Sequence, residues 1–216
     1  MDNNQFDINP IRCKTILVGN SGVGKTSIIS RYLGKYNPDE KTTIGASFTN
    51  KLEKINDKQI LFEIWDTAGQ ERYRSINNIF YQDAYICLLV YDITDRQSFE
   101  DIRDYWYKSV LEEAPENIIF HLVGNKADLF INEKIDRKEV EDYCKEIDME
   151  VTFISAQKEN SADIDILFNK LGEKFINSDL FKEYEKSLIK NQIKKRTLDD
   201  ETTEDKIVLK KKRCCH

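Results

Sequence analysis

The chain has 216 residues, which is enough for one medium-sized domain and a tail. Its 40% hydrophobic and 33% charged residues predict a soluble protein with a polar surface. The net charge of −6 at pH 7 argues against a general nucleic-acid-binding protein, which would be basic. The longest apolar run, residues 86–91, is far shorter than the ~20 residues of a membrane span.

The N-terminal residues 1–11 are polar, and we expect them to form a flexible end. They lack signal-peptide features, and Asp2 rules out N-myristoylation. Three of the five cysteines are scattered in core-like segments, and the other two are adjacent at positions 214 and 215. This distribution is no disulfide pattern and favours a reducing, cytosolic compartment.

A glycine-rich stretch at residues 19–26, GNSGVGKT, lies between an expected strand at 12–18 and an expected helix at 24–33. This order is typical of the phosphate-binding P-loop, in which backbone N–H groups and a helix N-terminus face phosphate oxygens. Lys25 can neutralise the β- and γ-phosphates, and the Thr26 hydroxyl can bind Mg²⁺. The predicted phosphate-binding residues of this loop are Ser21, Gly22, Val23, Gly24, Lys25 and Thr26.

A polar loop at 36–45 leads to two strand-like runs, 48–55 and 59–66, which flank Asn56 and Asp57. This spacing predicts a hairpin and therefore one antiparallel pair. A second polar loop and a less regular helical stretch follow, up to about residue 81.

Strands and helices alternate from residue 84 onward, which predicts an α/β fold: a mostly parallel six-stranded sheet with one antiparallel strand and helices on both faces. The strands are expected at 84–91, 118–123 and 151–155, and the helices at 98–113, 136–147 and 164–176. Right-handed crossovers then gather the loops after the strands at the carboxyl edge of the sheet.

Two loops at this edge can act on the phosphates. Asp66 ends a strand and can hold Mg²⁺, Gly69 can bring its N–H close to a γ-phosphate, and Gln70 can orient an attacking water. Thr43, in the loop at 36–45, offers Mg²⁺ a second hydroxyl only while a γ-phosphate holds that loop in place.

Other loops can recognise the base. Asp128, in the NKAD segment at 125–128, can accept two N–H groups from the Watson–Crick edge of guanine, whereas adenine presents a different edge. Backbone N–H groups of Ser155 and Ala156 could reach the base carbonyl. Tyr36 could stack on the nucleotide or cover the core.

These motifs resemble, in order and approximate spacing, those of small Ras-like GTPases, and most closely those of the Rab family. The Rab pattern is matched by TIGASF at 43–48, WDTAGQERY at 65–73 and VYDIT at 90–94. The resemblance covers residues 12–176 and implies a P-loop NTPase G domain. The ASF segment at 46–48 looks most like the endosomal branch.

The resemblance implies a GTP/GDP switch in which Thr43 and residues 66–69 sense the γ-phosphate and Gln70 is catalytic. Asn125, Lys126 and Asp128 would bind guanine. Hydrolysis should be slow without a partner, because no residue is recognisable as an arginine supplied in cis.

The resemblance also implies partners. These are a guanine nucleotide exchange factor, a GTPase-activating protein (GAP), a GDP-dissociation inhibitor, an escort protein, and effectors that bind the switch regions at 36–45 and 66–81. The protein would act in vesicle traffic at the cytoplasmic face of intracellular membranes and cycle with the cytosol. No nucleic-acid partner is expected.

We expect a GTPase domain at 12–178 and a hypervariable tail at 179–216. A basic cluster at residues 206–213 can attract anionic lipids, at about 1 kcal/mol per basic residue. Cys214 and Cys215 are the expected sites of double geranylgeranylation, and two lipid chains anchor stably where one does not. The chain departs from the family at Gln157, where Lys is usual, and in the single residue after the cysteine pair.

Three other functions stay open at this point. One is a soluble nuclear-transport switch like Ran, without a lipid anchor. A second is a scaffold that binds GTP but does not hydrolyse it. The third is a P-loop ATPase or kinase, against which Asp128 argues.

Overall fold

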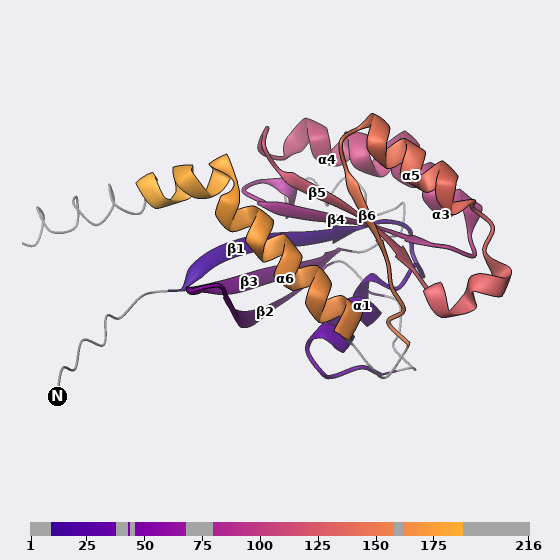
Figure 1. Cartoon of the computed structure of the whole chain (residues 1–216), viewed down its shortest axis with the longest axis horizontal. Helices are drawn as coiled ribbons and strands as arrows, with labels where there is room; N and C mark the ends of the chain where they lie inside the picture. The colour runs from indigo at the N-terminus through magenta and orange to yellow at the C-terminus, as the bar shows by residue number, and fades with distance from the viewer. Residues whose placement is uncertain (1–9, 38–42, 44–45, 68–79, 158–161, 188–216) are drawn as a thin grey trace, which may run out of the picture. The chain divides into compact units, whose positions relative to one another are not determined.

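The computed structural model describes residues 10–37, 43, 46–67, 80–157 and 162–187 (Figure 1). The chain divides into two compact units, residues 1–176 and 177–216. The first unit holds the sheet, and the described part of the second is helical at 179–187. Among the described residues, no helix combines the length and apolar character that crossing a bilayer requires.

Six strands form one sheet in the order β2-β3-β1-β4-β5-β6. The β2–β3 hairpin is antiparallel and every other pairing is parallel, which confirms the predicted fold class. The strands are β1 Ile11–Val18, β2 Ala46–Ile55, β3 Lys58–Thr67, β4 Ile86–Asp92, β5 Ile119–Asn125 and β6 Glu150–Phe153.

Helices cover both faces of this sheet (Figure 1). They are α1 Lys25–Tyr32, α3 Arg96–Asp101, the π-helix η2 Ile102–Trp106, α4 Tyr107–Glu113, the 3-10 helix η3 Ala127–Asn132, α5 Arg137–Glu146 and α6 Ala162–Asn177. On one face, Tyr32 of α1 stacks on Phe168 of α6 at 3.7 Å between ring centroids. On the other face, Phe99 and Val140 join one buried cluster with strands β1 and β4.

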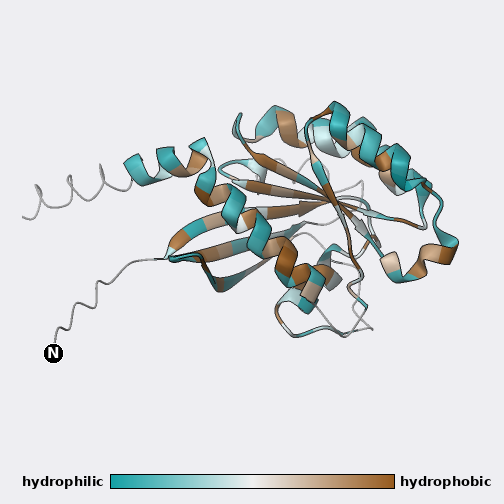
Figure 2. Ribbon diagram, viewed as in Figure 1, coloured by the Kyte–Doolittle hydropathy of each residue, from teal (hydrophilic) through white to brown (hydrophobic). Residues whose placement is uncertain are grey.

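The burial pattern explains why these strands lie where they do. All seven residues of β4 are buried, as expected for a central strand covered on both faces. The strand is mostly hydrophobic along its length (Figure 2). The edge strand β2 alternates more exposed with less exposed residues. Because β1, β3, β4, β5 and β6 run parallel, their carboxyl ends meet at one edge, and the loops that follow them define the candidate site.

Two helical features differ from the sequence prediction. The helix expected at 98–113 contains the π-helix η2 between α3 and α4, and the 3-10 helix η3 was not expected. Each depends on long-range contacts and on local backbone angles that hydrophobic periodicity does not encode. Most of the helix expected up to residue 81 lies outside the described residues.

His121 of β5 is fully buried, and its Nε2 lies 2.8 Å from the Thr152 hydroxyl. The pKa of His121 is lowered to about 4, mainly by burial and also by the positive charges of Lys174 and Lys170, while the charge of Glu150 opposes the shift. Imidazole therefore stays neutral in the fold at a pH where it would be protonated in the unfolded chain.

We expect the free energy of unfolding to fall as the pH drops from about 6.5 to about 4, because only the unfolded chain takes up the histidine proton in that range. His121 should contribute a slope of at most about 1.4 kcal/mol per pH unit. Urea unfolding across this range measures it. The variant His121→Gln keeps a partner for Thr152 and should flatten the curve; an identical pH dependence in both proteins would contradict the assignment.

Candidate functional site

The loop after β1 is shaped by close contacts that only glycine permits. Gly19 and Gly24 have φ angles of 144° and 96°. A Cβ on Gly19 would lie 2.1 Å from the Val90 carbonyl oxygen, and one on Gly24 would lie 2.3 Å from Asn125 Nδ2. The loop therefore packs directly against β4 and β5.

Helix α1 begins at Lys25, and its N-cap Gly24 provides no side-chain hydrogen bond. The first N–H groups of a helix have no acceptor within the helix, so they can bind an anion. Ser21 and Gly22 lie exposed at the tip of the loop, whereas Val23 is buried. The predicted phosphate-binding residues thus form one loop with its backbone open at the tip.

Lys25 is almost fully buried, and its Nζ donates to the carbonyl oxygens of Gly19 at 2.8 Å and Asn20 at 2.9 Å. Burial lowers the pKa of Lys25 to about 8, and the negative charge of Asp66 opposes this shift. A bound phosphate would favour the protonated form of Lys25 and so raise its pKa, and the side chain is already held across the loop.

Thr26, Thr43 and Asp66 converge although they come from three separate segments. Thr26 Oγ1 lies 2.6 Å from Asp66 Oδ2 and 2.7 Å from Thr43 Oγ1, and Thr43 Oγ1 lies 3.2 Å from Asp66 Oδ2. Two hydroxyls and one carboxylate are the hard oxygen ligands that Mg²⁺ prefers, and it usually takes only one or two carboxylates from protein. Within the described residues, no group of three or more His, Cys, Asp or Glu side chains could hold a metal.

Asn125, at the end of β5, joins the phosphate loop to the neighbouring strand-end loops. Its Nδ2 donates to the Val23 carbonyl at 2.8 Å, and its Oδ1 accepts from the Ala156 N–H at 3.2 Å. The side chain is buried, so removing it would leave polar groups unpaired, at roughly 1–3 kcal/mol each.

The remaining predicted base-binding residues lie beside Asn125. The Ser155 hydroxyl donates to Asp128 Oδ1, which ties the β5 loop to the β6 loop. Lys126 has a left-handed backbone, and its Nζ pairs with Asp92 Oδ2 at 2.6 Å. Asp128 thus lies at the edge of a group of side chains that are held by hydrogen bonds and an ion pair.

Tyr36 is held near this group by Arg31. The Arg31 guanidinium lies 3.8 Å from the Tyr36 ring centroid, and its Nε donates to the Ala156 carbonyl at 2.8 Å. Gln157, the departure noted above, is exposed, and its carbonyl accepts from Arg31 Nη2 at 3.0 Å.

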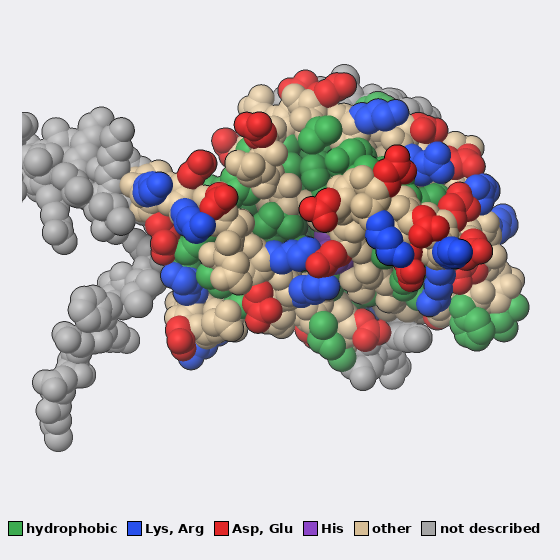
Figure 3. Space-filling view, turned by 45° about the horizontal axis from the view of Figure 1, so that its top comes forward, with side chains coloured by type: hydrophobic (Ala, Val, Ile, Leu, Met, Phe, Trp, Pro, Cys, Tyr) green, Lys and Arg blue, Asp and Glu red, His purple; other side chains and the backbone are tan. Residues whose placement is uncertain are grey.

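A hydrophobic patch lies next to the base loop on η3. Leu129, Phe130 and Ile131 are 39%, 62% and 84% exposed, and Figure 3 shows green side chains at the lower right of the visible face. The same face shows further green side chains at its upper centre, with acidic and basic side chains interspersed around them (Figure 3).

Some predicted residues lie outside the described part of the chain. They are Gly69, Gln70, Cys214 and Cys215. The structure therefore bears on the phosphate and base loops but not on the expected catalytic or lipidated side chains.

Sequence reasoning assigned no role to Asp92, Asn20 or Arg31. Asp92 ends a buried strand at the same edge as Asp66, and that position alone could have marked it. The contacts of Asn20 with Asp101 and Trp106 span more than 80 positions and left no local signal.

Comparisons with known proteins show which proteins this chain is similar to. Residues 14–177 match the model of the Ras family. The Ras-related protein SEC4 of Candida albicans is 36% identical over 159 residues, which cover 73% of this chain and 74% of that protein. The GTP-binding protein ypt3 of Schizosaccharomyces pombe is 37% identical over 156 residues (72% of each chain), and the Ras-related protein Rab-13 of Rattus norvegicus is 38% identical over 159 residues (73% and 77%).

We expect nucleotide binding at pH 8.5 to take up ~0.7 proton, because a Lys25 pKa of about 8 should rise well above 8.5 beside phosphate. Calorimetric titration of GDP in buffers with different ionisation enthalpies measures this uptake. At pH 6.5 Lys25 is already charged and its share should vanish. The variant Lys25→Arg stays protonated, and an uptake equal to that of wild type would contradict the assignment.

Proposed function

The chain belongs to the Ras family of small GTPases and is Rab-like, and from this we propose that it is a membrane switch in vesicle traffic that recruits effectors in its GTP state. As a GTPase of this family, it binds GTP and GDP and hydrolyses GTP to GDP and phosphate. The assignment of residues is best supported by the two buried hydrogen bonds of Asn125, which join the phosphate loop to the base loops.

We assign the phosphates to residues 21–26 and to Gly69, and guanine to the loops around Asn125. Asp128 would accept the two N–H groups of guanine, while its hydrogen bond from Ser155 orients the carboxylate. Lys126 and Tyr36 would flank the base, because Asp92 and Arg31 hold them beside this loop. We also assign the base carbonyl to the backbone N–H groups of Ser155 and Ala156. The Ala156 N–H, which donates to Asn125 Oδ1 at 3.2 Å, would share or exchange that bond when the base binds.

Thr26, Thr43 and Asp66 would hold Mg²⁺, directly or through water. The bound ion would neutralise charge on the β- and γ-phosphate oxygens. Thr43 lies outside any helix or strand, so its contact with Thr26 and Asp66 can depend on the nucleotide. Thr26, in contrast, is fixed in helix α1.

Three aromatic rings next to this cluster support effector recruitment. Phe48 lies 5.0 Å from Trp65, and Trp65 lies 5.2 Å from Phe80, between ring centroids. Phe48 is half exposed on the edge strand β2, close in sequence to Thr43, and Trp65 directly precedes Asp66. A partner that packs on these rings would contact both γ-phosphate-sensing segments, and aromatic anchors are typical of such interfaces.

The proposed cycle needs the partners that the Rab resemblance implies: an exchange factor, a GAP, a GDP-dissociation inhibitor, an escort protein and effectors. Membrane attachment would come from the lipidated cysteines and the basic cluster at 206–213, on the cytoplasmic face of intracellular membranes. We propose an endosomal membrane in particular, on the ASF segment at 46–48.

We expect Gln70→Leu to abolish most of the GAP-stimulated hydrolysis, because leucine cannot orient the attacking water. In Ras, a GAP accelerates the reaction ~10⁵-fold. Phosphate release from GTP-loaded protein with and without GAP measures the loss. Gln82→Leu makes the same change at an exposed glutamine outside the site and should behave as wild type; GAP-stimulated rates that match wild type in Gln70→Leu would remove Gln70 from catalysis.

We expect the double variant Cys214→Ser/Cys215→Ser to move from the membrane to the soluble fraction of its own cells, because two lipid chains are lost. Each single variant keeps one chain and should bind membranes weakly. Intact mass before and after substitution counts the lipids, and protein made without a prenyltransferase serves as the lipid-free control. A double variant that stays on membranes would show that attachment does not need these thiols.

A further inference from the structure

A side chain of the phosphate loop is held from outside the loop. Asn20 Oδ1 accepts from the indole Nε1–H of Trp106 at 2.7 Å, and Asn20 Nδ2 donates to Asp101 Oδ2 at 2.5 Å. Both polar atoms of this carboxamide are therefore bound to one helix. We call these three residues, Asn20, Asp101 and Trp106, the Asn20 clamp.

The π-helix η2 makes this clamp possible. Asp101 and Trp106 are five positions apart, and in an α-helix such residues point about 140° away from each other. Here the Tyr107 N–H bonds to the Ile102 carbonyl, five residues earlier. A turn closed in this way brings residues five apart to the same side, so both can reach one carboxamide.

The clamp acts on the lysine that faces the phosphates. The Asn20 carbonyl accepts from Lys25 Nζ at 2.9 Å, so the same residue is fixed through its side chain and holds Lys25 through its backbone. Trp106 is fully buried, so water does not compete with Asn20 for its indole N–H. A shift of Asn20 would therefore move the loop and the ammonium group together.

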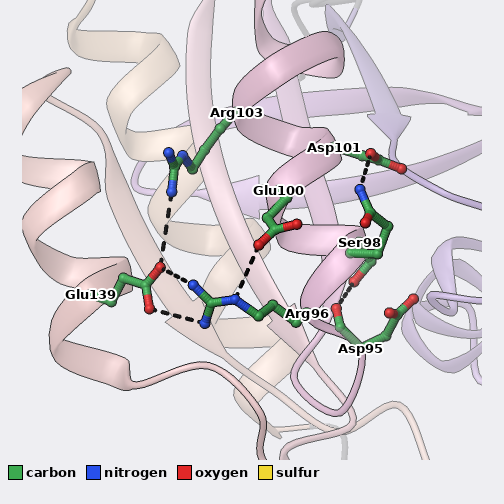
Figure 4. Close-up of polar contacts among 8 residues, drawn as sticks. Asp95, Arg96, Ser98, Glu100, Asp101, Arg103 and Glu139 are labelled. Atoms are coloured by element: carbon green, nitrogen blue, oxygen red, sulfur yellow. Dashed lines mark hydrogen bonds and ion pairs between the residues drawn. The ribbon is translucent and has the colours of Figure 1, made fainter.

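The helix that carries the clamp is fixed on its other sides. Arg96 pairs with Glu139 of α5 at 2.8 Å and with Glu100 at 3.1 Å (Figure 4). Gln97 donates to Asp101 Oδ1 at 2.9 Å, which orients the clamp carboxylate. At the start of this helix, the Ser98 hydroxyl accepts from the Asp92 N–H at 3.1 Å.

We propose that Asp101 and Trp106 are positioning residues for the nucleotide phosphates, which act through Asn20 to hold the phosphate loop and Lys25 in the binding geometry. The inference rests on the proposed nucleotide site. It predicts that loss of the clamp speeds the release of GDP while the fold remains.

The most discriminating test exchanges the amide and the carboxylate of the contact between Asn20 and Asp101. Asn20→Asp places a carboxylate against Asp101, so one of the two must be protonated for the contact to survive. GDP release relative to wild type should then be close to 1 at pH 5 and rise about three- to tenfold by pH 8. Asn20→Asp/Asp101→Asn restores one carboxylate and one amide, keeps an acceptor for Trp106 and for Gln97, and should return release to the wild-type rate at both pH values.

A second variant tests the hydrogen bond from Trp106 to Asn20. Trp106→Phe keeps a buried ring but removes the N–H, and should also speed GDP release about three- to tenfold. Asp104→Asn makes the carboxylate-to-amide change at an exposed site of the same helix and should not alter release. Release is followed with a fluorescent GDP analogue, and thermal unfolding of each variant is measured in parallel.

Rescue by the double exchange and a pH-dependent defect in Asn20→Asp support the proposal, because a merely structural loss would show neither. Wild-type release rates in Asn20→Asp at pH 8, or no rescue in the double variant, overturn it. Wild-type protein that fails to retain GDP overturns instead the proposed nucleotide site, so the two failures are distinguishable.

Discussion

The polar side chains buried at the carboxyl edge of the sheet must find hydrogen-bond or ion-pair partners in the loops around them, and the rest of the site depends on this constraint. Lys25, Asp66, Asp92, Asn125 and Ser155 are each at most 7% exposed there. A buried polar group without a partner costs roughly 1–3 kcal/mol, so each side chain has few favourable orientations. The loops at the ends of five different strands are thereby fixed relative to each other before any nucleotide is considered.

The phosphate side and the base side of the site differ in how they are held. Asn125, Asp128 and Ser155 are connected through β5 and β6, whose positions the sheet determines. Thr43, in contrast, reaches Asp66 from outside any helix or strand. A ligand can shift a protein between states only if it binds those states differently, and Thr43 is the described residue best placed to supply that difference.

The helical run from α3 to α4 contributes to both sides at once. Its first turn supports Asp92, which pairs with Lys126, and its π-turn holds Asn20 of the phosphate loop. π-turns inside helices are rare and occur frequently at functional sites. Here the irregular turn has an identifiable role, because it orients two side chains toward the phosphate loop.

The sequence alone determined the sheet, the hairpin and the two kinds of loop. Apolar periodicity gave the strands and helices within a few residues of their observed ends, and the glycines of the phosphate loop stand where the backbone requires them. Only the tertiary structure decided that Asn125 bonds to Val23, that Lys126 pairs with Asp92, and that Asp101 and Trp106 hold Asn20. Local patterns report which face of an element is buried, whereas a hydrogen bond between distant residues depends on how the sheet brings its loops together.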